Sequence, residues 1–185
     1  AGMLISNIAG TAYTMTNVHT YGCKIFALQK VGGLAARVAA TNTTIQNCSV
    51  NNCYIENYEC KDHKENFSKT ASGVTVSGSF YSHGEVGGMF GFVEQNTTMD
   101  NCQVNGTTIY AFGEDGLTAI LKGSGFTGNL AVIALKALGY YKIPGRPVGT
   151  FIGNIRTTAS GGGTITMTNI SVDAASKCTK QWDKH

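Results

Sequence analysis

Four short stretches of this chain share one pattern, and this recurrence limits the fold more than any other feature of the sequence. The pattern is Thr, an apolar residue, any residue, Asn, an apolar residue, any residue, and Val or Thr. It occurs at residues 14–20, 44–50, 98–104 and 166–172. A second block, with Gly at its second position, precedes each stretch at residues 1–8, 31–38, 86–93 and 148–155. Such self-similarity is typical of folds whose units bury their cores by stacking on one another.

Alternation of residue types assigns faces within these blocks, because successive side chains of a strand point to opposite sides. In the Gly block, Leu34, Ala36 and Val38 are predicted to point inward, as are their counterparts in the other copies. A third block predicts an inward column made of Ile25, Ile55 and Ile109. The intervening positions are predicted to point outward.

The asparagine of the recurring pattern is predicted to mark a corner. The alternation changes phase within the pattern, which a straight strand would not allow. Asparagine tolerates left-handed backbone, and stacked amides can hydrogen-bond along a ladder. We therefore expect a buried corner ladder, formed by Asn17, Asn47, Asn101 and Asn169.

These patterns predict an all-β fold, a β-solenoid (β-helix) of about four irregular coils in a single domain covering residues 1–185. Glycine contributes 24 of the 185 residues and charged residues only 14%, a composition that favours short strands and tight turns over long helices. Insertions are expected at about residues 57–85 and 111–147. The second should contain one short helix, from about Asn129 to Gly139. Because the chain opens within a Gly block, we expect it to be a fragment or mature form of a longer protein.

The Gly blocks resemble those of GLUG-type repeats, short glycine-rich units of large bacterial surface or secreted proteins. The resemblance is carried by "GGLAA", "GGMFG" and "GTFIG", each followed by the asparagine pattern. It implies a β-solenoid in a non-catalytic part of a larger protein. The first of these motifs lacks the closing glycine.

The six cysteines allow two interpretations. Cys48 and Cys102 occupy the same position of the pattern, and Cys23 and Cys53 share another. Neighbouring strands lie about 4.8 Å apart, within the range of Cα separations of disulfides. Since the same columns hold Val, Ile or Thr elsewhere, free buried thiols are the favoured interpretation. No cysteine spacing fits a zinc site, so neither a metal nor another cofactor is predicted.

Catalytic residues are few. Asp62, His63, Lys64 and Glu65 could supply acid and base groups, but four consecutive ionisable residues more often form a solvated loop. Glu114 and Asp115 allow the same two interpretations. A carbohydrate-active β-helix enzyme, a polysaccharide lyase or hydrolase, is therefore the alternative function. Among the residues predicted to point outward from the Gly blocks, only Arg37 is charged, which argues against a catalytic groove there.

Aromatic residues supply the candidate binding site. Phe90 and Phe92, with Ile152, are predicted to form an outward apolar patch; the favoured interpretation is that the helix of the second insertion covers it. Otherwise the patch would contact a partner or sugar rings, with Tyr140, Tyr141 and Arg146 as further contacts.

The leading prediction is a non-catalytic module, secreted or displayed on a bacterial cell surface, for adhesion, binding of a glycan or a host or matrix protein, or scaffolding. The net charge of +3 forms no basic stripe, so nucleic acid is not an expected partner. No apolar run is long enough for a membrane span. A threonine column at residues 14, 44, 98 and 166 raises ice binding as a remote alternative. The six Asn-x-Ser/Thr sequons, at residues 42, 47, 66, 96, 105 and 169, do not identify the source.

Overall fold

The computed structural model describes most of the chain, and its described part is all-β. The described residues are 1–27, 30–57, 64–71, 74–81, 85–113, 148–156 and 161–182. None of them is helical, and the prediction of an all-β fold is confirmed. The helix expected from Asn129 to Gly139 lies outside the described residues and stays a prediction.

In the described part of the chain, nineteen strands belong to five parallel sheets, each of which takes its strands from successive stretches of the chain. Sheet I contains β5 (Val31–Gly32), β12 (Val86–Gly87) and β17 (Val148–Gly149). Sheet II contains β1 (Ile5–Ile8), β6 (Ala35–Val38), β13 (Phe90–Val93) and β18 (Ile152–Ile155). Sheet III contains β2 (Tyr13–Thr16), β7 (Asn42–Gln46), β14 (Asn96–Asp100) and β19 (Ile165–Thr168).

The other two parallel sheets follow the same order. Sheet IV contains β3 (His19–Tyr21), β8 (Ser49–Asn51), β15 (Gln103–Asn105) and β20 (Ser171–Val172). Sheet V contains β4 (Lys24–Ala27), β9 (Tyr54–Asn57), β16 (Thr108–Gly113) and β21 (Lys177–Trp182). An antiparallel hairpin of β10 (Lys64–Ala71) and β11 (Val74–Tyr81) comes between β9 and β12 in the chain.

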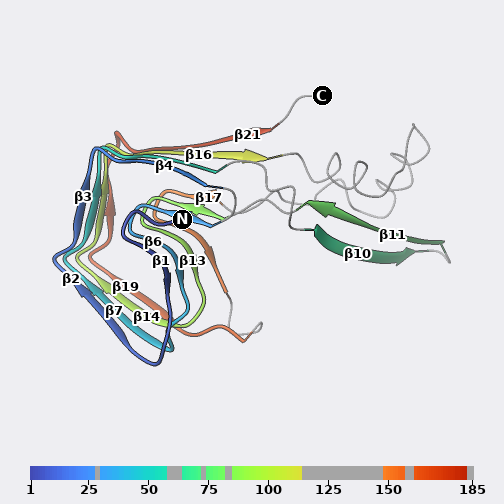
Figure 1. The fold of residues 1–185 in the computed structure, drawn as a ribbon, viewed down its shortest axis with the longest axis horizontal. Coiled ribbons are helices and arrows are strands. Elements are labelled where there is room, and N and C mark those ends of the chain that lie inside the picture. Colours follow the sequence, from blue (N-terminus) through green and yellow to red (C-terminus); the bar gives the residue numbers. More distant parts are fainter. Residues whose placement is uncertain are drawn as a thin grey trace.

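The chain thus forms four stacked segments, which we number 1 (residues 1–27), 2 (31–57), 3 (86–113) and 4 (148–182). Figure 1 looks along the stack, so that the equivalent strands of successive segments overlap. Sheets II, III, IV and V follow one another around the outline. Sheet I lies inside it and contacts strands of both sheet II and sheet V. The core therefore lies between the sheets and runs the length of the stack.

The register of the sheets matches the alignment of the blocks. Thr44 pairs with Thr14 and Thr98, and Thr98 also pairs with Thr166. In the Gly block, Gly87 pairs with both Gly32 and Gly149. Because equivalent residues lie side by side, each sequence position becomes a column that runs along the stack.

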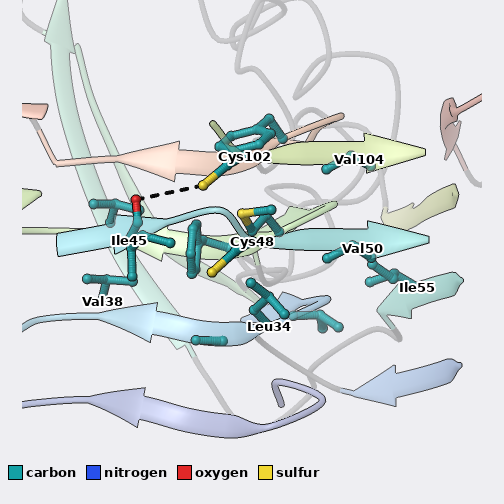
Figure 2. Packing of buried hydrophobic residues seen from close by; sticks show 14 of the residues in the cluster. Leu34, Val38, Ile45, Cys48, Val50, Ile55, Cys102 and Val104 are labelled. Atoms are coloured by element: carbon teal, nitrogen blue, oxygen red, sulfur yellow. Dashed lines mark hydrogen bonds between the residues drawn. The ribbon is translucent and has the colours of Figure 1, made fainter. Parts of the chain in front are cut away.

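The inward columns supply an apolar core. Figure 2 shows Leu34, Val38 and Ile45 packed around Cys48 and Val50, and all five are at most 1% exposed. One inward position of sheet II holds only small residues, and the reason is steric. A Cβ added at Gly91 would lie 2.7 Å from both the carbonyl oxygen of Ala36 and the amide nitrogen of Val31. The backbone of sheet I passes so close that this position has no room for a larger residue.

Candidate ligand-binding face

The predicted apolar patch on sheet II is not an accessible surface at its centre. Phe90 is fully buried and belongs to the hydrophobic core cluster, with Ala35 and Ile152 as its register partners. This burial contradicts the alternative in which Phe90 contacts a ligand and agrees with the favoured interpretation that the patch is covered. Alternation tells which way a side chain points, but not whether another layer covers it. Phe92 is only partly buried, and the ammonium group of Lys30 lies 5.1 Å from its ring centroid.

Most of the other predicted site residues belong to the part of the chain that the structure does not describe. Tyr140, Tyr141 and Arg146 lie outside the described residues, as does the helix expected to cover Phe90. The same holds for the acid and base candidates at residues 62, 63, 114 and 115. Lys64 and Glu65 begin β10, of which only the backbone is described.

The asparagine column lies at the turn between sheets III and IV. Asn17, Asn47, Asn101 and Asn169 have φ angles of 57°, 51°, 48° and 52°. All four side chains are exposed, so the expectation that the corner is buried is wrong. The inward position of this corner belongs to the next residue, which is Cys48 in segment 2 and Cys102 in segment 3 and is fully buried in both.

The exposed amides contact one another over only part of the column. The Nδ2 of Asn101 donates a hydrogen bond to the Oδ1 of Asn47 at 2.8 Å. The Nδ2 of Asn169 instead donates to the Oδ1 of Asp100 at 3.0 Å. The column therefore serves mainly to hold left-handed backbone, which asparagine adopts more readily than most residues do.

A second corner, between sheets IV and V, went unrecognised in the sequence. Gly22, Asn52 and Gly106 have φ angles of 62°, 53° and 55°. The signal is the Gly or Asn that stands immediately before each third block. In segment 4, Asp173 and Ser176 build a different turn here, and the Ser176 hydroxyl donates to the Oδ1 of Asp173 at 2.6 Å.

Cys23, Cys48, Cys53 and Cys102 are free thiols. Cys48, Cys53 and Cys102 are buried, Cys23 is partly buried and Cys178 is exposed. The Cys102 thiol donates to the carbonyl oxygen of Ile45 at 3.8 Å, the contact dashed in Figure 2. A hydrogen bond between the two stacked thiols lowers the pKa of Cys48 and raises that of Cys102.

A charged cluster borders sheet II. The guanidinium of Arg37 donates to both carboxylate oxygens of Glu94, from Nε at 2.8 Å and from Nη2 at 2.6 Å. The Nη1 of Arg156 lies 3.9 Å from the same carboxylate, whose side chain is almost buried. This bidentate pair raises the pKa of Arg37. We assign the cluster a structural role, because its one carboxylate is already occupied by two cations.

The outer face of sheet V gathers aromatic and charged side chains. We call it the aromatic face and define it by Lys24, Phe26, Tyr54, Glu56, Tyr110 and Lys177. The alternate positions of its strands are the inward isoleucines, Ile25, Ile55 and Ile109, so the face residues point away from the core.

The register arranges the rings diagonally across the aromatic face. Phe26 pairs with Glu56, which pairs with Tyr110, while Tyr54 lies one column away. The ring centroids of Phe26 and Tyr54 are 5.8 Å apart and tilted by 43°. Phe26 is 48% exposed, and the Tyr54 hydroxyl donates to the Oε2 of Glu56 at 2.8 Å. The lysines lie at the two ends of Tyr54's column, in segments 1 and 4.

This arrangement is suited to binding a ligand by packing it against the aromatic rings. The exposed ring of Phe26 and the half-buried rings of Tyr54 and Tyr110 offer apolar contact area, and the hydroxyl, carboxylate and ammonium groups beside them can hydrogen-bond a ligand. Sequence reasoning missed this face because its columns mix residue types. The available signal was the alternation around the predicted isoleucine column.

Comparisons with models of protein families, with curated proteins and with solved structures find no match to this chain. Within the described ranges, no helix is long and apolar enough to cross a membrane.

Proposed function

We propose that the four segments are coils of a β-solenoid, and that this solenoid is a non-catalytic module that binds glycans through the aromatic face. The same-order strands of five parallel sheets, with equivalent residues in register, support the solenoid. From the resemblance of the Gly blocks to GLUG-type repeats, we further propose that the module is bacterial, that it is secreted or displayed on the cell surface, and that it has an adhesive or scaffolding role.

The observation that carries the binding function is the set of rings on the outer face of sheet V. The C–H faces of a sugar ring pack well on aromatic rings, and its hydroxyls need polar neighbours at the edges. Phe26, Tyr54 and Tyr110 supply the rings, and Glu56 with the two lysines supplies the polar edge. A glycan of a host cell or its matrix is the expected partner.

The aromatic face does not have the composition of a glycosidase site, which uses a pair of carboxylates on either side of the bond to be cleaved. Of the six residues that define the face, only Glu56 is acidic, and it accepts a hydrogen bond from Tyr54. Incubation with acidic polysaccharides tests the enzyme alternative directly. New reducing ends or unsaturated products, made by the intact protein, would contradict the non-catalytic function.

Binding of the intact protein to immobilised polysaccharides and matrix glycans tests the proposal. We expect Phe26→Ala and Tyr110→Ala each to weaken binding about tenfold, because each removes one ring of the face. Tyr21→Ala is the matched control, since Tyr21 is a highly exposed tyrosine of sheet IV that lies outside the face. Background binding to every glycan by folded protein, or an equal loss in Tyr21→Ala, would contradict the proposed site.

A further inference from the structure

Two cysteines are stacked at the corner between sheets IV and V, one in segment 1 and one in segment 2. Cys23 and Cys53 directly precede β4 and β9, whose first residues, Lys24 and Tyr54, are register partners. The amide of Tyr54 donates a hydrogen bond to the carbonyl oxygen of Cys23 at 2.7 Å. The two cysteines therefore lie side by side on strands that are about 4.8 Å apart, and disulfides span Cα separations of about 4.4–6.8 Å.

The two side chains adopt the same arrangement. The Cys23 thiol donates to the carbonyl oxygen of Tyr21 at 3.2 Å, and the Cys53 thiol donates to that of Asn51 at 3.3 Å. Each acceptor thus lies two residues before its cysteine. Desolvation, together with the charge and hydrogen-bond interactions with Cys53, raises the pKa of Cys23. Interactions of this kind require that the two sulfur atoms be near each other.

The column that contains these cysteines allows a single disulfide. Beyond Cys53 its other two members, both described, are Thr107 and Ser176. The hydroxyl oxygen of Thr107 accepts a hydrogen bond from the amide of Cys53 at 3.3 Å. The sulfur neighbour of Cys53 in the column is therefore Cys23. Since the same corner holds threonine or serine in segments 3 and 4, it should also accept serine in place of either cysteine.

The two thiols differ in their access to solvent. Cys23 is partly exposed in segment 1, at the end of the stack, whereas Cys53 is only 3% exposed. A dissolved oxidant therefore reaches Cys23 first, and Cys53 is placed to react with the product. The other stacked pair, Cys48 and Cys102, is fully buried and offers no such point of attack.

We propose that Cys23 and Cys53 are a redox-active pair, which a low-molecular-weight disulfide such as oxidised glutathione converts into a covalent bond between segments 1 and 2. The thiolate of Cys23 attacks the glutathione disulfide, forms a mixed disulfide and releases one glutathione thiolate. The thiolate of Cys53 then attacks the Cys23 sulfur and displaces the second glutathione thiolate. The two cysteines lose two protons and two electrons, and one glutathione disulfide becomes two molecules of glutathione.

The bond fixes segment 1 to segment 2 beside the aromatic face. Phe26 follows Cys23 in β4, and Tyr54 follows Cys53 in β9, so the bond joins the two strands whose rings lie 5.8 Å apart. It also closes a loop from residue 23 to residue 53, which restricts the unfolded chain. Oxidation should therefore raise the stability of the protein.

Treatment of the folded, reduced protein with oxidised glutathione tests the proposal. We expect a link between Cys23 and Cys53, located by tandem mass spectrometry, and a rise in Tm of about 5–10 °C that a reductant reverses. Because the thiolate attacks and the pKa of Cys23 is raised, the reaction should be about tenfold faster at pH 8 than at pH 7. A folded protein whose Cys23 and Cys53 stay unlinked, or whose Cys23 stops at the mixed disulfide, would overturn the proposal.

Variants separate this pair from the other cysteines. Cys23→Ser and Cys53→Ser should each abolish the rise in Tm, whereas Cys178→Ser, which changes an exposed cysteine of sheet V, should retain it. In the folded wild type, Cys48 and Cys102 should link at least about tenfold more slowly, because both are buried. A full rise in Cys23→Ser, or its loss in Cys178→Ser, would contradict the assignment of the bond. These measurements do not depend on glycan binding, so they test the pair separately from the proposed function.

Discussion

The middle of the stack and its segment 4 end use similar residues at equivalent positions, but bury them very differently. Ile45 and Met99, in segments 2 and 3, are fully buried, whereas their counterpart Met167 in segment 4 is 49% exposed. Likewise, Val104 is fully buried and Val172 is 38% exposed. Residue type at an inward position therefore does not determine burial; the presence of stacked neighbours does.

The segment 1 end does not mirror the segment 4 end. Segment 1 also pairs with a single neighbour, yet Met15 is buried and the main exposed inward residue is Leu4, at 54%. Among the described inward positions, segment 4 exposes three large apolar residues, Ile155, Met167 and Val172, whereas segment 1 exposes only Leu4. Equivalent substitutions should consequently have different effects in different segments, and this difference can be measured.

The largest contrast is expected at the small inward position of sheet II. Gly91→Leu should cost about 3 kcal/mol or more, because any Cβ there meets the backbone of Ala36 and Val31. Ser6→Leu, at the equivalent but exposed position of segment 1, should change stability by less than about 0.5 kcal/mol. Urea denaturation followed by circular dichroism compares the two. Equal losses would contradict the assignment of this column.

The next contrast concerns the methionines of sheet III. Met99→Ala should destabilise the protein by about 2–5 kcal/mol, through lost burial and a new cavity. Met167→Ala should cost less than about 1 kcal/mol, since half of its side chain already contacts solvent. Thermal and urea unfolding of both variants provides the measurement. If Met167→Ala is as harmful as Met99→Ala, another part of the protein covers the segment 4 end in solution.

A third prediction identifies an effect that should not depend on stacking. Asn101→Leu should cost about 1–2 kcal/mol, because leucine is disfavoured at positive φ, and Asn169→Leu in segment 4 should cost a similar amount. Asn101→Gly should be nearly neutral, because glycine adopts this backbone freely. The same denaturation experiments apply. A large loss in Asn101→Gly would show that the amide, rather than the backbone, stabilises the corner.

The smallest effect is expected at Asp173, which is exposed. Hydrogen bonds from the Ser176 hydroxyl and the Gly106 amide lower the pKa of its carboxyl. A carboxyl whose pKa is lowered on folding stabilises the protein above the unfolded value, about 3.9, and this contribution is lost as pH falls through the folded value. Asp173→Asn should therefore reduce Tm slightly at neutral pH and not at pH 2. A Tm difference that stays constant from pH 7 to pH 2 would contradict this prediction.

The columns were predictable from the sequence because each depends on a local rule. Alternation predicts which side chains share a face, and alignment of the blocks predicts which residues pair across strands. The pairing of Gly32 with Gly87, and of Thr44 with Thr98, follows from these two rules alone. Positive φ at the asparagines was likewise predictable from the conformational preference of that residue.

The candidate sites were not predictable in the same way, because they depend on which layers cover which faces. Phe90 has the alternation of an outward residue but is buried, while Phe26 is exposed and Tyr54 half-buried in columns of mixed composition. Exposure and hydrogen bonding at these positions are properties of the assembled stack.

The connections between segments determine where the chain can accept insertions. Every passage from one segment to the next leaves sheet V and returns at sheet I, through residues 28–30, 58–85 and 114–147. The lengths of these passages differ greatly, yet the columns of all five sheets stay in register on either side. Insertions between sheet V and sheet I are therefore compatible with the register of the sheets. New sequence can be acquired there without rebuilding the core. For protein engineering, the connections from sheet V to sheet I are the natural place to graft a foreign loop.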